Sequence, residues 1–297
     1  MTNAIQSRER TVRTNGVELA AEAFGDPADA PLLLIMGGMA SMLWWPDEFC
    51  RTLASRGRYL IRYDHRDTGR STKYPPGSAP YSLDDFVKDA IGVLDEYGID
   101  RAHIVGMSLG GMIGQLAAIA HPSRVLSLTA ISTTPVGAES SRLPASGEAW
   151  FEHQATTSGT VDWSDRSQVI GFVVDDARLT ASTRHPFDEA RFRAFVERDY
   201  DRSGGYLSAT NHGVLMQETS KRTGSRDMRA PLLVIHGTSD PVFPIGHGIA
   251  LSTSVPGAKL VRVEGGGHEL HPADWDTIVD AIVAHTASAQ KNESHGD

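Results

Sequence analysis

The feature that most constrains the fold of this chain is a predicted strand that turns at once into a helix. Residues 103–106 are apolar enough for a buried strand. From Leu109 onward, apolar side chains recur at helical spacing until His121-Pro122. The turn between strand and helix reads Gly106-Met107-Ser108-Leu109-Gly110. Flanking glycines leave room for the neighbouring strand and helix, so this segment predicts a tight β-turn-α unit of a parallel sheet.

Strands and helices alternate on both sides of this unit. Asn15-Gly16 is typical of a type I′ turn and predicts a hairpin of residues 10–14 and 17–24. Further strands are predicted at 32–36, 59–63, 103–106, 125–131, 232–236 and 259–263, and helices at 46–55, 83–97, 109–120, 246–254 and 275–284. We therefore predict an α/β fold with a mostly parallel eight-stranded sheet flanked by helices.

The middle of the chain has a different pattern. From Thr134 to Ser225 the strand signal disappears, aromatic and arginine residues are frequent, and the clearest periodic segment is a helix at 188–198. This change predicts a helical cap subdomain at 134–225. The cap interrupts a core made of residues 1–133 and 226–297.

Composition excludes several classes of function. The 297 residues include 28 Lys+Arg and 37 Asp+Glu, a net charge of −9, which does not favour nucleic-acid binding. The most apolar early window, 31–40, is about half the length of a membrane span. A single cysteine, Cys50, and a start without a signal-peptide pattern lead us to expect a cytoplasmic protein. Neither a phosphate cradle nor a zinc motif is present, so we expect no cofactor and no metal, while a homodimer is compatible with the sequence.

Ser108 is the candidate nucleophile. A serine on a sharp strand-to-helix turn projects its hydroxyl above the sheet. The amide of Leu109 lies at the start of a helix, where free N–H groups favour an anionic oxygen. The alternative is a tight turn with an incidental serine.

A serine nucleophile requires a base and an acid that orients the base. Asp240 follows the predicted strand 232–236, and His268 follows the strand 259–263 after three glycines that suit a mobile loop. Both lie at carboxyl ends of strands, where active sites of open α/β sheets gather. His271 is the rival base, and an Asx-turn before Pro241 is the alternative role for Asp240.

The loop after residues 32–36 should supply the second oxyanion donor. In Met36-Gly37-Gly38-Met39 we assign the Gly38 amide to this role, with the Met39 amide next. Apolar side chains around these loops, which also fit an ordinary core, predict a substrate pocket lined by Met39, Met42, Met107 and Trp44. The polar run at 64–71 is interpreted as structural, through turn capping and ion pairs.

Taken in order, these motifs make the chain resemble the α/β-hydrolase superfamily over nearly its whole length. The segments FGDPADAPLLLIMGG, WWPDEF and RYDHRDTGRS are similar to bacterial methylesterases that act on anthracycline polyketides. The resemblance implies hydrolysis of a carboxylic ester on a bulky apolar small molecule without a cofactor. It also implies a Ser108, Asp240 and His268 triad with Gly38 and Leu109 as oxyanion amides. Met36 stands where many members of the superfamily have histidine.

The same triad serves other reactions. Perhydrolysis by cofactor-free haloperoxidases, acyl transfer and hydrolysis of carbon-carbon bonds all use similar side chains, and a non-catalytic ligand receptor can share the fold. Product analysis with ester, diketone and peroxide substrates separates the reactions. Failure of a fluorophosphonate probe to label Ser108 would favour a receptor.

Overall fold

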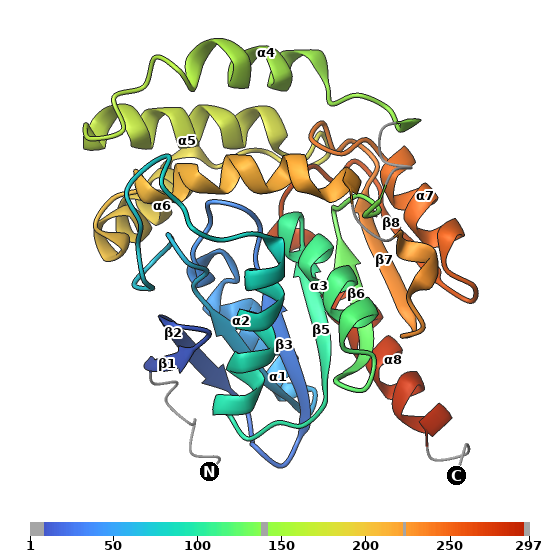
Figure 1. Cartoon of the computed structure of the whole chain (residues 1–297). Coiled ribbons are helices and arrows are strands. Elements are labelled where there is room, and N and C mark those ends of the chain that lie inside the picture. Colours follow the sequence, from blue (N-terminus) through green and yellow to red (C-terminus); the bar gives the residue numbers. More distant parts are fainter. Residues whose placement is uncertain (1–8, 138–141, 222–223, 294–297) are drawn as a thin grey trace.

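A single eight-stranded sheet runs through the part of the chain that the computed structural model describes, residues 9–137, 142–221 and 224–293 (Figure 1). Its order is β1-β2-β4-β3-β5-β6-β7-β8. β1 and β2 pair antiparallel and β2 pairs antiparallel with β4, whereas β3 to β8 are parallel. The strands are β1 Arg10–Thr14, β2 Val17–Phe24, β3 Ala30–Ile35, β4 Arg58–Tyr63, β5 Ala102–Met107, β6 Val125–Ile131, β7 Leu232–Gly237 and β8 Lys259–Val263. The predicted α/β fold is confirmed.

Helices cover both faces of the sheet, and the sheet separates two apolar cores. α2 (Leu83–Glu96), α3 (Leu109–Ala120) and α7 (Gly246–Ser254) pack on one face. α1 (Asp47–Ser55) and α8 (Trp275–Glu293) pack on the other. The sequence of β3 is continuously apolar because the strand is buried on both faces. Leu33 and Ile35 face the first core, and Leu32 and Leu34 face the second.

The predicted end of the last helix at Ala284 is wrong, because α8 continues to Glu293. Contacts with the core of the protein hold these additional turns of α8 in place. The buried guanidinium of Arg58 donates to the Thr286 hydroxyl at 2.8 and 3.0 Å, and Ala289 is buried. Residues 1–8, where we found no signal-peptide pattern, and 294–297 lie outside the described residues. No described helix has the length and apolar character to span a membrane.

The chain between β6 and β7 forms a helical layer. It contains α4 (Glu148–Thr157), α5 (Arg166–Thr180), α6 (Glu189–Ser203) and the 3-10 helix η3 (Ser208–Lys221). Figure 1 shows α4, α5 and α6 stacked above the edge at which the parallel strands end. We call residues 134–225 the cap. α6 is longer than the predicted helix at 188–198, because it begins after the capping carboxylate of Asp188 and ends only at Gly204, whose φ of 65° stops it.

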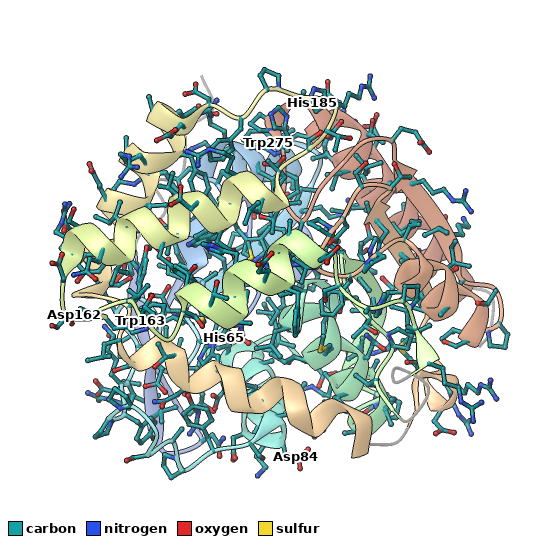
Figure 2. The ribbon with its side chains drawn as sticks, turned by 90° about the horizontal axis from the view of Figure 1, so that it is seen from above. His65, Asp84, Asp162, Trp163, His185 and Trp275 are labelled. Atoms are coloured by element: carbon teal, nitrogen blue, oxygen red, sulfur yellow. The ribbon has the colours of Figure 1, made fainter. Side chains whose placement is uncertain are left out.

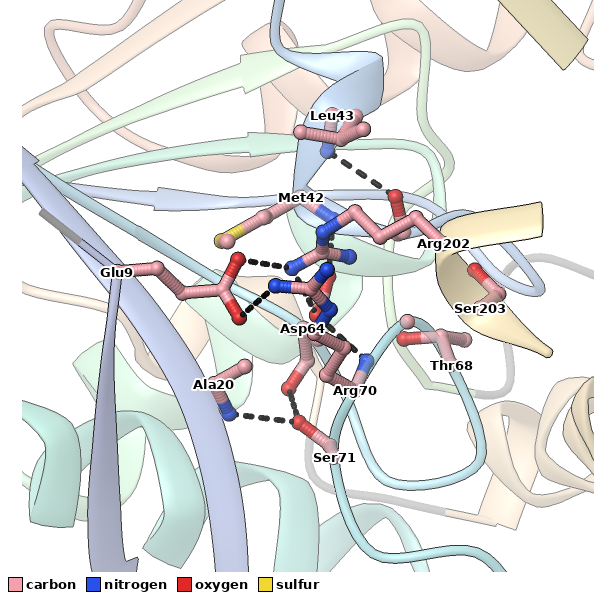
Figure 3. A network of polar contacts seen from close by, with 12 residues as sticks. Glu9, Ala20, Met42, Leu43, Asp64, Thr68, Arg70, Ser71, Arg202 and Ser203 are labelled. Atoms are coloured by element: carbon pink, nitrogen blue, oxygen red, sulfur yellow. Dashed lines mark hydrogen bonds and ion pairs between the residues drawn. The ribbon is translucent and has the colours of Figure 1, made fainter. Parts of the chain in front are cut away.

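A buried network joins the cap to the core (Figure 3). Arg202 of α6 donates to Asp64 at 2.8 Å and to Glu9 at 3.0 Å. Asp64 also accepts the backbone amides of Met42 at 2.7 Å and Arg70 at 2.9 Å. The structural role predicted for the polar run at 64–71 is thus confirmed, and the network fixes the loop after β3 against the cap.

Candidate active site

Ser108 occupies the tight turn between β5 and α3 in a strained backbone conformation. Its φ of 53° and ψ of −121° lie where side chains are rarely tolerated. A Cβ at Gly106 would approach the Gly110 carbonyl oxygen to 2.2 Å, and one at Gly110 would approach the Ile35 oxygen to 2.0 Å. The glycines that the sequence places around Ser108 are therefore required by close backbone packing.

Neighbouring strands hold this turn in place. The Ser108 amide donates to the Ile131 carbonyl at 2.9 Å. The Ser108 carbonyl accepts the Thr133 hydroxyl at 2.7 Å and the Gly111 amide at 2.9 Å. With both backbone groups paired, the strained residue stays fixed and its side chain remains partly exposed.

We predict that Ser108→Gly raises the free energy of unfolding by about 1 kcal/mol relative to Ser108→Ala, because glycine tolerates this positive φ. Both variants lack the hydroxyl, so the difference between them isolates the strain. Urea unfolding of the two proteins measures it. Equal stability, or a less stable glycine variant, would show that the turn stores no such strain.

Asp240 and His268 form a hydrogen-bonded pair at the carboxyl ends of β7 and β8. The Nδ1 atom of His268 lies 2.8 Å from Oδ2 of Asp240. The other carboxylate oxygen accepts the amides of Val242 at 2.8 Å and Phe243 at 3.0 Å. Burial raises the pKa of Asp240, but the opposing effects of the His268 ring and of these donors are larger, and the pKa falls below its usual value. Asp240 is thus built to be an anion that orients His268.

The three glycines before His268 are closely packed in the structure, and a mobile loop at this place stays a prediction. A Cβ at Gly267 would lie 2.1 Å from the Thr180 carbonyl oxygen at the end of α5. The His268 amide donates to that same oxygen at 2.8 Å. The cap therefore helps to position the candidate base.

The other histidines near the pair have different roles. His271, the rival base, caps the short helix η5 (Pro272–Asp274), where its Nδ1 accepts the Ala273 amide at 3.2 Å. His236 lies buried in β7. Its Nε2 is 2.7 Å from the Phe243 carbonyl oxygen and 3.6 Å from Oδ2 of Asp240. His236 therefore lies beside the carboxylate of Asp240, within the sheet.

The loop after β3 passes directly over the start of α3. A Cβ at Gly37 would lie 3.2 Å from the Ser108 Cβ, and one at Gly38 would lie 3.5 Å from Cδ2 of Leu109. Gly38 is exposed, whereas the Met39 amide is occupied by a 2.9 Å hydrogen bond to Nδ1 of His212. Of the two amides that we proposed from the sequence, the geometry favours Gly38.

The four predicted pocket residues have different surroundings. Met42 and Met107 are buried, and Met39 is half-buried. Trp44 reaches into the cap, where it packs edge-on against Phe195 at 5.3 Å and Phe192 at 5.7 Å between ring centroids. Its indole N–H donates to Asp199 at 3.1 Å. A pocket role for these residues stays a prediction, and Trp44 contacts the cap aromatics.

One described group of side chains has ligand atoms close enough for a metal ion: His185, His271 and Asp274, all within 4.8 Å of one another. His185 lies near Trp275 in the view from above (Figure 2). The two imidazole rings stack face to face, 4.4 Å apart and 11° from parallel, so one point cannot lie in both ring planes. The 3.2 Å contact between His185 and Asp274 fits a polar link between cap and core better than a metal centre.

Three buried histidines predict acid sensitivity. Burial lowers the pKa of His65, His103 and His212 to about 4. Because the unfolded chain has histidine pKa values near about 6.5, it takes up these protons first as the pH falls. We predict that the free energy of unfolding decreases between about pH 6.5 and pH 4, by at most about 1.4 kcal/mol per pH unit for each histidine. Urea titrations at several pH values test this, and a flat profile would contradict it.

Comparisons with known proteins agree with this geometry. The sequence profile described as the alpha/beta hydrolase fold matches residues 30–273. The chain belongs to the α/β-hydrolase family. This α/β-hydrolase is 36% identical over 296 residues to "Rhodomycin D methylesterase DauP" of Streptomyces sp. (strain C5), covering 94% of this chain and 98% of the relative. Identity and coverage are the same for "Rhodomycin D methylesterase DnrP" of Streptomyces peucetius.

Solved structures agree on the fold of this α/β-hydrolase. A hydrolase from Pseudomonas aeruginosa PA01 superposes with a TM-score of 0.69 at 25% identity, covering 95% of this chain and 99% of the other. The enol-lactonase from Burkholderia xenovorans LB400 superposes with a TM-score of 0.74 at 20% identity, covering 94% and 100%. The predicted fold family, with its sheet and inserted helices, is confirmed.

Proposed function

We propose that this protein is a serine hydrolase that cleaves a carboxylic ester of a bulky, apolar small molecule. One observation carries the proposal. The ionised Asp240 holds Nδ1 of His268 at 2.8 Å, at the same edge of the sheet where Ser108 stands on its strained turn. The nucleophile thus follows β5, the acid follows β7 and the base follows β8, which is the chain order of a serine triad on this type of sheet.

In the proposed reaction, His268 takes the proton of Ser108 as the serine oxygen attacks the ester carbonyl. The carbonyl oxygen becomes an oxyanion, which accepts hydrogen bonds from the amides of Gly38 and Leu109. Collapse breaks the bond to the alcohol oxygen, and His268 returns its proton to that oxygen. Water then attacks the acyl-enzyme with His268 as base, releasing the carboxylic acid and free Ser108.

We infer the substrate class from the aromatic residues and the charge of the cap and from the similar proteins. Cap aromatics such as Phe192 and Phe195 pack on Trp44 beside the oxyanion loop, which suits a polycyclic or otherwise extended apolar molecule. The cap carries 10 Lys+Arg and 13 Asp+Glu, a net of −3, which does not favour a polyanion. Similarity to two rhodomycin D methylesterases favours a methyl ester, so that the bulky part of the substrate is the acyl group.

A panel of esters tests this function. We expect the purified protein to hydrolyse methyl esters of polycyclic aromatic acids with a higher kcat/KM than methyl esters of short acids. The acid and methanol should appear in equal amounts. Hydrolysis of none of these esters, nor of p-nitrophenyl acetate, together with no labelling by a fluorophosphonate, would overturn the proposal and point to a ligand receptor.

A further inference from the structure

Two buried imidazoles hold the ends of the oxyanion loop, residues 36–39. His65 has its Nε2 2.9 Å from the Met36 carbonyl oxygen, and His212 has its Nδ1 2.9 Å from the Met39 amide. His65 belongs to the core, whereas His212 comes from η3 in the cap. The candidate oxyanion donor Gly38 lies between these two anchors.

The tautomer of His212 follows from its contacts. Its Nε2 lies 2.7 Å from the carbonyl oxygen of Arg66, which can only accept a hydrogen bond, so Nε2 carries the proton. Nδ1 is then free to accept from Met39. The Arg66 guanidinium donates to the Asp89 carboxylate at 2.6 and 2.7 Å. The residue that accepts the hydrogen bond from Nε2 of His212 is therefore itself held in place.

The bond to Met39 constrains the peptide next to Gly38. Met39 has a φ of 63°, a conformation that a residue other than glycine holds only when its surroundings impose it. The two preceding glycines would otherwise allow many backbone orientations. Gly38 also lies next to both the start of α3 and the cap, since a Cβ there would lie 3.5 Å from Cδ2 of Leu109 and 3.9 Å from the His212 Cβ.

A second cap residue holds the continuation of the loop. Asp199 of α6 accepts the hydroxyl of Ser41 at 2.5 Å and the indole N–H of Trp44 at 3.1 Å. Tyr206 donates to the same carboxylate at 2.8 Å. The loop that carries Gly38 is therefore tied to the cap at two places.

We propose that His212 is a positioning residue that fixes the Gly38 amide for the oxyanion, so that the cap and the oxyanion hole act as one unit. This inference rests on the proposed ester hydrolysis. Since the Gly38 amide is needed where negative charge develops, His212 stabilises the transition state more than the bound ester.

Two substitutions of similar size test the hydrogen bonds of Nδ1 and Nε2 separately. In His212→Asn the side-chain oxygen can occupy the place of Nδ1 and accept from Met39. In His212→Gln the terminal amide reaches the place of Nε2 and can donate to Arg66, but the acceptor for Met39 is lost. We expect His212→Gln to lower kcat about 10- to 100-fold with KM nearly unchanged, and His212→Asn to stay within about threefold of the wild type.

Inhibition by a trifluoromethyl ketone distinguishes a positioning role of His212 from a purely structural role, which would not change the inhibition constant. The ketone forms a hemiketal oxyanion on the serine, so its inhibition constant should weaken in His212→Gln by the same factor as kcat/KM. The control is His103→Gln, which removes another buried imidazole, 2.8 Å from the Ser127 hydroxyl in the lower part of the sheet. It should lower the melting temperature and leave the inhibition constant unchanged.

The outcomes separate the inference from the proposed function. An active, fluorophosphonate-labelled wild type with equal kcat and inhibition constants in the asparagine and glutamine variants would overturn the role of His212 alone. An effect on KM without an effect on kcat would do the same. A wild type that neither turns over esters nor reacts with the probe would overturn both.

Discussion

Ser108→Ala is expected to lower kcat/KM on a p-nitrophenyl ester by about 10⁴-fold or more. The substitution removes the only atom that can form the acyl-enzyme, while the Cβ and the strained backbone of the turn remain. Water held by His268 and the oxyanion amides can support only slow residual hydrolysis. Steady-state rates and circular dichroism of the two proteins measure activity and folding together.

A matched serine serves as the control for that substitution. Ser127 is buried in β6, where its hydroxyl contacts His103. Ser127→Ala should cost some stability but keep kcat/KM near the wild-type value. If Ser108→Ala retained activity within about tenfold of the wild type, Ser108 would not be the nucleophile.

Asp240→Asn is expected to lower kcat by about 10³- to 10⁴-fold with little change in KM. An amide in place of the carboxylate no longer selects the tautomer that presents a lone pair at Nε2, and it does not stabilise the imidazolium. Since the pKa of Asp240 lies below its usual value, the carboxylate is ionised throughout the neutral range. Steady-state kinetics at neutral pH, where the wild-type carboxylate is ionised, measure the loss.

Two further aspartates make this prediction specific. Asp201 pairs with Arg166 on the surface at 2.9 Å, and Asp201→Asn should leave kcat unchanged. Asp176 is a cap carboxylate that accepts the Trp150 indole at 2.9 Å. Burial raises the pKa of Asp176, whereas the hydrogen bonds from Gln154 and Trp150 and, to a smaller extent, the His268 ring act in the opposite direction. A mild effect of Asp240→Asn beside a large effect of Asp176→Asn would mean that the acid comes from the cap.

The core of the fold was predictable because its signals are local. Each buried strand is a short apolar run, and β6 and β8 have the predicted bounds. The cap is harder to predict, because α4 has no buried residue among those described and depends on α5 for its place. The last turns of α8 also depend on a distant partner, the guanidinium of Arg58.

The residues of the site also differ in whether the sequence could predict them. Ser108, Asp240 and His268 could be proposed because each follows a recognisable strand at its carboxyl end. His212 and Asp199 could not, because they are 173 and 158 residues away in sequence from the loop atoms that they contact. No local motif distinguishes His212 from the other histidines of the helical insertion.

Labelling with a fluorophosphonate, followed by intact-mass and peptide mass spectrometry, tests the central claim most directly. The account predicts one adduct per chain, located on Ser108, that forms in parallel with the loss of esterase activity. Labelling should be absent in Ser108→Ala and much slower in Asp240→Asn. An adduct on another residue, or full esterase activity in a protein that carries the adduct on Ser108, would contradict it.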